Sequence, residues 1–218
     1  MSQIVIIAGP QAAGKSTVIA NLNRRFIKQR LVSARSPVLF VLQESRQIIA
    51  HKNISLGAIF MTPAEECEAV ECDLNRMNLI LRRDHRHVVF IDECNIFTIA
   101  HALAHGIKDL EQYREAYYTR LKALHAAVVF LDVPPALSWE RRRKQYDKRL
   151  VYFPRKDHAD ITMRYRRYLE LIHPLLHEMY ESLPFPKAMI DATGGKRLLI
   201  KKVADRIAEL VPALRFNP

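Results

Sequence analysis

The sequence predicts an α/β fold, a three-layer sandwich in which a parallel β-sheet has helices on both faces, built as one domain over residues 1–218. Strand-length segments are apolar along their whole length, as expected for strands buried on both faces. Helical patterns separate these strands along the chain, the order typical of parallel sheets. The 218 residues are 49% hydrophobic. A chain of this size buries roughly 70% of its unfolded surface, so we expect a single core.

Five segments have the pattern of a buried strand. They are Gln3 to Ala8, Val38 to Leu42, Val88 to Ile91, Ala127 to Leu131 and Lys187 to Ile190. Helices are expected between and after these strands because apolar residues recur there at helical spacing. The expected ranges are Lys15 to Arg30, Thr62 to Arg86, Phe97 to His105, Asp109 to His125, Pro134 to Arg143, Asp157 to Glu181 and Lys196 to Leu210. The sequence Thr62-Pro63 is a strong helix start, a capping residue followed by proline at the first helical position.

A glycine-rich motif joins the first expected strand to the first expected helix. It reads Gly-Pro-Gln-Ala-Ala-Gly-Lys-Ser-Thr from Gly9 to Thr17 and matches the P-loop pattern GxxxxGK[ST]. In such a loop, backbone N–H groups and the positive end of the helix dipole surround a phosphate, so we expect ATP to bind here. The expected contacts are Gly9, Gln11, Ala12, Ala13, Gly14, Lys15, Ser16 and Thr17.

Two residues of this motif have expected chemical roles. Lys15 would neutralise the β- and γ-phosphates, and the hydroxyl of Ser16 would bind Mg²⁺. The alternative is an ordinary glycine-rich turn.

Acidic residues follow the second and third strands, at the sheet edge where ligands of such folds bind. Asp92 could hold the water shell of the metal ion, or instead cap the following helix. Its neighbour Glu93 gives a sequence similar to the Walker B motif of ATPases, in which a glutamate polarises water. Glu44 could accept a proton from an acceptor hydroxyl, or instead pair with Arg46. Glu44, Arg46 and Glu93 are therefore the acceptor-binding candidates at this edge.

Arginine residues supply the remaining candidates. Arg76 lies on the helix that precedes Asp92 and could bind an acceptor phosphate with its guanidinium group, or form a surface salt bridge. The segment from Trp139 to Arg167 holds eleven Lys or Arg against four Asp or Glu, so +7 of the net charge of +11 lies there. Its function could be to bring cations to a phosphate, or it could be a solvated helical face.

We interpret residues of about 139–156 as a basic lid. Phosphoryl transfer spreads negative charge over the moving group, so cations on a mobile loop would stabilise it once water is expelled. Arg141 and Arg143 are the expected catalytic arginines, although position does not separate Arg143 from Lys144. Arg149 is expected to contact the adenine or a phosphate of ATP.

The chain resembles the thymidylate kinases and deoxynucleoside kinases, a group of P-loop phosphotransferases. The resemblance rests on the P-loop, Asn75-Arg76, Asp92, and three further stretches. These are Leu131-Asp132-Val133-Pro134-Pro135, Tyr168-Leu169-Glu170-Leu171 and Ile190-Asp191-Ala192. The resemblance implies a five-stranded parallel sheet in the order 2-3-1-4-5, a lid, and ATP with Mg²⁺ as the phosphoryl donor.

Two stretches depart from thymidylate kinases. The second strand is followed by Gln43-Glu44-Ser45-Arg46 in place of Arg-Glu-Pro-Gly, and the third ends in Asp92-Glu93-Cys94 in place of Asp-Arg-Tyr. The leading interpretation is thus an ATP-dependent kinase for a nucleotide, a nucleoside or another small acceptor. An ATPase or nucleotide switch that uses Asp92-Glu93 is one alternative. A nucleic-acid-directed P-loop enzyme is another, because the pI is 9.8.

Two further expectations concern the setting of the protein. No apolar stretch reaches the roughly 18 to 20 residues that span a bilayer, and the first apolar run leads into the P-loop and not into a cleavage site, so we expect a cytoplasmic protein with no membrane partner. The apolar side of the helix from Thr62 could pair with a second subunit in a homodimer, as in similar kinases.

Overall fold

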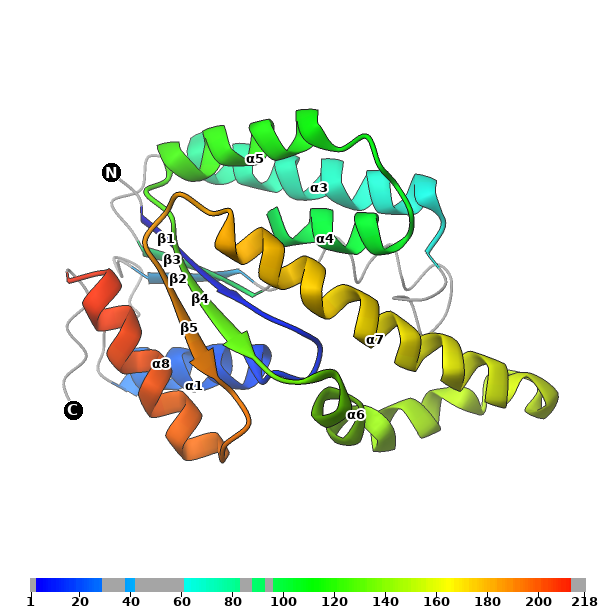
Figure 1. Cartoon of the computed structure of the whole chain (residues 1–218). Coiled ribbons are helices and arrows are strands. Elements are labelled where there is room, and N and C mark those ends of the chain that lie inside the picture. Colours follow the sequence, from blue (N-terminus) through cyan, green and yellow to red (C-terminus); the bar gives the residue numbers. More distant parts are fainter. Residues whose placement is uncertain (1–2, 29–37, 42–60, 83–87, 93–95, 213–218) are drawn as a thin grey trace.

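The computed structural model describes residues 3–28, 38–41, 61–82, 88–92 and 96–212, and its centre is a parallel β-sheet (Figure 1). The strands are β1 (Gln3–Ala8), β2 (Val38–Val41), β3 (Val88–Asp92), β4 (Ala127–Asp132) and β5 (Lys187–Asp191). They follow one another in the order β2-β3-β1-β4-β5, which is the order that the resemblance implies. In this register Ile7 of β1 lies beside Asp92 of β3, and Ala8 lies beside Phe130 of β4. The carboxyl ends of the three central strands therefore meet at one edge.

Helices cover both faces of the sheet. They are α1 (Lys15–Lys28), α3 (Pro63–Arg82), α4 (Ile96–Ala104), α5 (Glu111–Ala123), α6 (Pro135–Leu150), α7 (His158–Glu181) and α8 (Lys196–Leu210), with a 3₁₀ turn at Arg155–Asp157. Alternate residues of β1 enter different cores, since successive side chains of a strand point to opposite faces. Ile4 and Ile6 pack with α3, α4, α5 and α7, whereas Val5 and Ile7 pack with α1 and α8. The fold is a three-layer sandwich.

Helix α3 begins where the sequence predicts. The backbone N–H of Thr62 donates to Glu65 Oε2 at 2.8 Å, and the N–H of Glu65 donates to Thr62 Oγ1 at 3.3 Å, the reciprocal pair of a capping box. On the apolar side of this helix, Val70, Leu74 and Met77 pack inside the chain. Leu79 of the same helix is 58% exposed, and the pairing with a second subunit stays a prediction.

Helix α6 is longer than the sequence predicts, because it continues past Arg143 to Leu150. Residues 139–150, which we expected in a mobile loop, are helical. The reason is packing: Tyr146 is buried and lies against Tyr165 of α7, with ring centroids 4.9 Å apart. The long basic segment thus forms one arm of the hairpin of α6 and α7 that projects from one end of the sheet (Figure 1).

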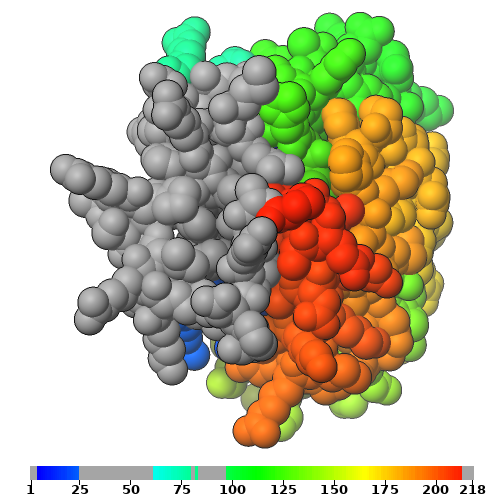
Figure 2. All heavy atoms as spheres, turned by 90° about the vertical axis from the view of Figure 1, so that its left-hand side faces the viewer, coloured from blue at the N-terminus to red at the C-terminus, as the bar shows by residue number. Residues whose placement is uncertain are grey.

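Helix α8 closes the second layer. Its buried residues recur at helical spacing and pack on the sheet, while the intervening charged residues face outward. Figure 2 shows this helix at the surface, in orange and red, with α5 above it. Among the helices that the structure describes, none combines the length and the apolar character needed to cross a membrane.

Candidate nucleotide site

The P-loop joins β1 to α1 in a backbone conformation that requires glycine. Gly9 has φ of +137°, and a Cβ there would lie 2.2 Å from the carbonyl oxygen of Leu131 in β4. Gly14 has φ of +99°, and Ala12 between them has φ of +59°. Positive φ values fold the chain back sharply. The loop therefore curls over the N-terminal end of α1, where the helix dipole favours an anion.

Lys15 lies against this loop and is buried, with 7% of its surface exposed. Its Nζ donates hydrogen bonds to the carbonyl oxygens of Gly9 at 2.7 Å and of Pro10 at 2.8 Å. The next residue, Ser16, is exposed in the first turn of α1, and the carbonyl of Thr17 accepts a hydrogen bond from Asn21. The loop thus places one ammonium group and one exposed hydroxyl beside the N-terminal end of α1.

Side chains from α6 and α7 contact the loop. Ser138 Oγ donates to the carbonyl oxygen of Gln11, and the hydroxyl of Tyr165 donates to the side-chain oxygen of the same residue. Arg141 donates to the carbonyl oxygens of Ala12 at 3.4 Å and of Thr193 at 3.0 Å. Both helices of the projecting hairpin therefore hydrogen-bond to the P-loop. Arg141 also links the P-loop to the segment after β5.

The other predicted arginines of α6 lie in different surroundings. Arg143 is 70% exposed and lies 4.0 Å from Asp147, its neighbour one turn along. Residues two positions apart in an α-helix are separated by about 200° of rotation about the helix axis. Arg143 is therefore on nearly the opposite side of α6 from Arg141. Arg149 is partly buried, and burial together with the nearby Arg142 lowers the pKa of its guanidinium group. The P-loop contact of Arg141 is therefore not shared by Arg143.

Arg142 and Arg149 face Tyr165, which contacts the P-loop. Burial raises the pKa of Tyr165 to about 12, while the positive charges of Arg142 and Arg149 act in the opposite direction. Arg142, Tyr146 and Arg149 are four and then three residues apart, so they share one face of α6. Sequence reasoning missed Ser138, Arg142 and Tyr165, although this spacing could have indicated that Arg142 and Arg149 act together.

The predicted acidic residues are only partly within the described residues. Strand β3 ends at Asp92, which lies beside Ile7 of β1. Ile7 is two residues before Gly9, the first residue of the P-loop. Glu93, Glu44 and Arg46 lie outside the residues that the structure describes. The backbone of Asp92 is thus at the position that a metal-binding carboxylate would need.

Arg76 is held within a buried network of polar side chains. Its Nη2 lies 2.5 Å from Asp73 Oδ1, and Asp73 is fully buried. The other carboxylate oxygen of Asp73 accepts hydrogen bonds from the hydroxyls of Tyr117 at 3.0 Å and Thr98 at 3.4 Å. Arg76 therefore forms a salt bridge, the alternative to phosphate binding that the sequence left open. The pair lies largely within the protein and not on its surface.

A second group of polar side chains joins α3, α4 and α7 above the same face of the sheet. His105 Nε2 lies 3.4 Å from Glu66 Oε1, and Glu66 is fully buried. His101 Nδ1 shares a hydrogen bond with the hydroxyl of Tyr168. The two histidines were not recognised from the sequence; His101 lies in the last turn of α4, and His105 directly follows the end of that helix. These polar contacts join α3 and the end of α4 to α7 within this layer.

Comparisons with known proteins agree with this architecture. A family model described as an AAA domain matches residues 4–197. No curated protein matches the chain significantly in sequence.

Solved structures with the same fold include deoxyadenosine kinase from M. mycoides with the products dCMP and dCDP bound, at 13% identity and a TM-score of 0.61, over 95% of this chain and 100% of the kinase. They also include the YorR protein from Bacillus subtilis in complex with phosphorylated GDP, at 17% identity and a TM-score of 0.59, over 98% of this chain and 100% of YorR. At these identities the similarity establishes the α/β fold of P-loop proteins and not the reaction.

Proposed function

The chain belongs to the family described as an AAA domain, and on that premise we propose that it is an ATP-dependent phosphotransferase. It would move the γ-phosphoryl group of ATP to a nucleotide, a nucleoside or another small acceptor. The observation that carries the proposal is the contact of a basic helix with a P-loop: Arg141 of α6 hydrogen-bonds to Ala12 in the loop that also holds Lys15. A purely structural loop has no need of this concentration of positive charge.

The donor half of the reaction follows from the residues around the loop. Lys15 would exchange its two carbonyl partners for the β- and γ-phosphates, whose charge it offsets. Arg141 would stabilise the charge that develops on the transferred group, because cations held in place before the reaction lower its barrier most effectively. Arg142 and Arg149, which face Tyr165, would add positive potential near the same loop. We propose no catalytic role for Arg143.

The oxygen groups near the loop fit Mg²⁺, which prefers oxygen ligands and retains several waters. The hydroxyl of Ser16 is exposed in the first turn of α1, and β3 brings Asp92 to the same edge of the sheet. We propose that Ser16 binds the ion directly and that Asp92 holds its water shell. The bound ion would supply charge neutralisation for the phosphates.

A nucleoside or nucleotide is the proposed acceptor. The two structural neighbours were solved with nucleotides bound, one of them a deoxyadenosine kinase with dCMP and dCDP. In this chain Glu44, Arg46 and Glu93 stay predictions for acceptor binding. Arg76 would reach an acceptor phosphate only by leaving Asp73, which is a costly exchange for a buried pair.

An acceptor screen tests the proposal. Purified protein with ATP and Mg²⁺ is incubated with single nucleosides, nucleoside monophosphates and other small alcohols, and ADP release is measured. We expect ADP release that depends on one class of acceptor and falls roughly 100-fold or more in Lys15→Ala, since one lost charge contact commonly costs that much. Lys201→Ala, which removes an exposed lysine of α8, is the matched control and should leave the rate unchanged.

Two outcomes would favour the alternatives. ATP hydrolysis at the same rate with and without every acceptor, lost in Glu93→Gln while ATP still binds, would identify an ATPase or switch. Binding of an oligonucleotide that weakens steeply with salt and stimulates turnover would instead identify a nucleic-acid-directed enzyme. Either result contradicts small-molecule phosphotransfer.

A further inference from the structure

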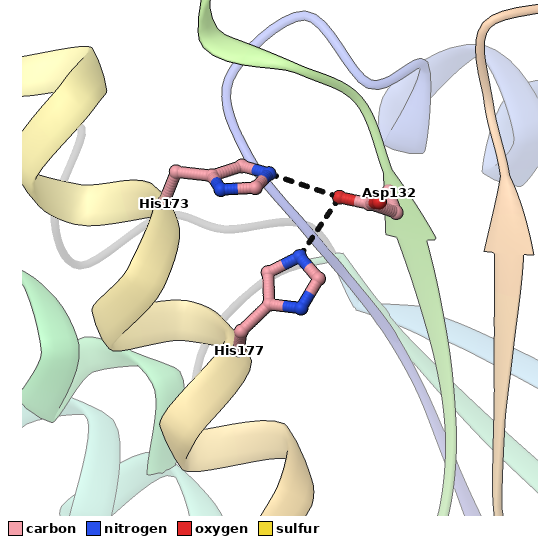
Figure 3. A group of neighbouring side chains, drawn as sticks. All are labelled: Asp132, His173 and His177. Carbon is pink, nitrogen blue, oxygen red and sulfur yellow. Dashed lines mark hydrogen bonds and ion pairs between the residues drawn. The ribbon is translucent and has the colours of Figure 1, made fainter.

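Three side chains with metal-binding atoms meet at the end of β4 (Figure 3). Asp132 is the last residue of that strand, and His173 and His177 lie one turn apart on α7. The Nε2 atoms of His173 and His177 lie 3.0 Å and 2.9 Å from the same carboxylate oxygen, Asp132 Oδ1. The three side chains are 30%, 23% and 29% exposed, in the same order. They form a group at the surface that solvent and small ions can reach.

The surrounding structure fixes the direction of each side chain. Residues four apart on a helix lie on one face, so both imidazole rings of α7 point at β4. The ring of His177 packs edge-on against Phe130, with centroids 5.2 Å apart, and the two histidine rings lie 4.6 Å apart. The carbonyl of Asp132 accepts a hydrogen bond from the N–H of Ala192 at 2.8 Å. The ligand atoms are therefore held by the sheet and a long helix, and not by a loop.

The distances suit a shared metal ion. Zinc bonds to imidazole nitrogen and carboxylate oxygen are about 2.0–2.2 Å, so two ligands of one ion lie roughly 3.0–3.4 Å apart at angles of about 90–110°. The two N–O distances, 3.0 Å and 2.9 Å, are at and just below the lower end of that range, and all three ligand atoms lie within 4.8 Å of one another. Small rotations of the side chains would be enough to admit an ion.

We propose that Asp132, His173 and His177 form a binding site for a divalent transition-metal ion, with Zn²⁺ as the best match. Two imidazole nitrogens and one carboxylate oxygen suit zinc and similar ions, whereas Mg²⁺ prefers oxygen ligands. The site is therefore distinct from the Mg²⁺ position proposed beside Ser16. Three protein ligands leave at least one coordination position for water or another ligand.

The bound ion would join α7 to the sheet close to the P-loop. Leu131, which precedes Asp132, is the residue whose carbonyl oxygen leaves no room for a Cβ at Gly9. Helix α7 also supplies Tyr165, which hydrogen-bonds to Gln11 of the loop. Metal binding at this site would thus restrain the helix that contacts the P-loop.

The competing interpretation is a group of hydrogen bonds only, in which each Nε2–H donates to Asp132 Oδ1. The two interpretations differ in a measurable way. An ion replaces the Nε2 protons and needs the negative charge of the carboxylate. An asparagine at position 132 can still accept a hydrogen bond but is a poor zinc ligand, so Asp132→Asn separates the two.

Binding is tested on chelator-treated, nucleotide-free protein. Titration with Zn²⁺ by calorimetry should give one equivalent, and Tm should rise by about 5 °C or more at 100 times Kd. Co²⁺ should give a visible spectrum without a thiolate band. We expect Asp132→Asn and the double variant His173→Ala/His177→Ala to weaken binding at least tenfold, because even indirect ligand partners contribute about 10–100-fold. His158→Ala, on the same helix, is the control and should bind Zn²⁺ as the wild type does.

Several results would overturn the proposal. These are the absence of saturable binding to the wild type, an unchanged Kd in Asp132→Asn, or a Co²⁺ thiolate band that places the ion on cysteine. If the double variant fails to fold, the single variant His173→Gln takes its place, and unchanged binding there has the same meaning. Far-UV circular dichroism without metal establishes that each variant is folded.

Discussion

Tyr165 of α7 donates a hydrogen bond to the side-chain oxygen of Gln11 in the P-loop, 154 residues earlier in the chain. Since Ser138 of α6 contacts the backbone of the same glutamine, both helices of the hairpin meet the loop at one residue. The position of the P-loop therefore depends on helices that follow β4, as well as on β1 and α1.

Tyr165→Phe removes this hydrogen bond while keeping the ring. A hydrogen bond of this kind contributes about 0.5–1.5 kcal/mol, so we expect the Kd for ATP to rise roughly two- to tenfold. Tyr146→Phe is the control, because the hydroxyl of Tyr146 contacts Thr162 at 3.3 Å and not the loop. Fluorescence titration with an ATP analogue measures both. Equal Kd values for the two variants would contradict a role of Tyr165 in positioning the loop.

The same tyrosine should make the protein sensitive to alkaline pH. Burial raises the pKa of Tyr165 from 10.0 to about 12. The unfolded chain loses this proton first, so between about pH 10 and 12 the unfolded state binds fewer protons and the free energy of unfolding falls as pH rises. The stability present below pH 10, up to about 3 kcal/mol, should be lost across this window. Urea unfolding of wild type and Tyr165→Phe should show a flatter pH dependence in the variant; parallel curves would exclude this contribution.

Arg141→Ala and Arg143→Ala form a matched pair on α6. Both remove an exposed arginine, but only Arg141 contacts the P-loop, whereas Arg143 pairs with Asp147. We expect kcat to fall roughly 100-fold in Arg141→Ala and to change less than twofold in Arg143→Ala. Steady-state kinetics with the acceptor from the screen measures both. A larger loss in Arg143→Ala would reverse the assignment.

Gly9→Ala places a Cβ 2.2 Å from the carbonyl oxygen of Leu131, in a backbone conformation that alanine rarely adopts. Either the loop or β4 must move, so we expect the free energy of unfolding to fall by about 2 kcal/mol or more. We also expect ATP binding to be lost. Gly195→Ala is the control, since a Cβ there meets nothing within 4 Å. Chemical denaturation and ATP titration measure the two effects. Wild-type behaviour of Gly9→Ala would refute the steric argument.

Asp73→Ala leaves the partly buried guanidinium of Arg76 without the carboxylate of Asp73. Removing one partner of a buried ion pair commonly costs about 3–5 kcal/mol. Thr98 and Tyr117 also lose the Asp73 carboxylate, although the Tyr117 hydroxyl keeps the carbonyl of Val70 at 3.2 Å. We expect a loss near the lower end of that range, because Arg76 is partly exposed. Glu115→Ala, an exposed acid on α5, should change the unfolding free energy by less than about 0.5 kcal/mol. Urea denaturation compares the two.

Local sequence signals were sufficient for the strands, for the P-loop and for the start of α3. The P-loop residues are consecutive, and the capping box joins Thr62 and Glu65, which are three positions apart, so both are visible in a short window. The end of α6 was misplaced because the helix is extended by the packing of Tyr146 on Tyr165, a contact between two helices.

The rest of the site depends on contacts between distant segments. Gln11 meets Tyr165, and Asp132 meets His173 and His177, only because the parallel sheet brings the ends of β1 and β4 together under α7. Composition and periodicity place each residue on an element but do not place the elements in space. Arg143 illustrates the same limit, since the sequence does not show that Arg141 contacts Ala12 while Arg143 lies beside Asp147.

Helix α7 contacts three parts of the molecule at once: Gln11 through Tyr165, His101 through Tyr168, and Asp132 through its two histidines. Because one helix carries all three contacts, a movement of the helix that changes one of them also affects the others. The free-energy effects of substitutions at Gln11, His101 and Asp132 should therefore be non-additive, and a double-mutant cycle between any two of them should give a measurable coupling energy. Thermodynamic coupling among the P-loop, α4 and the end of β4 would then arise from a single helix, α7.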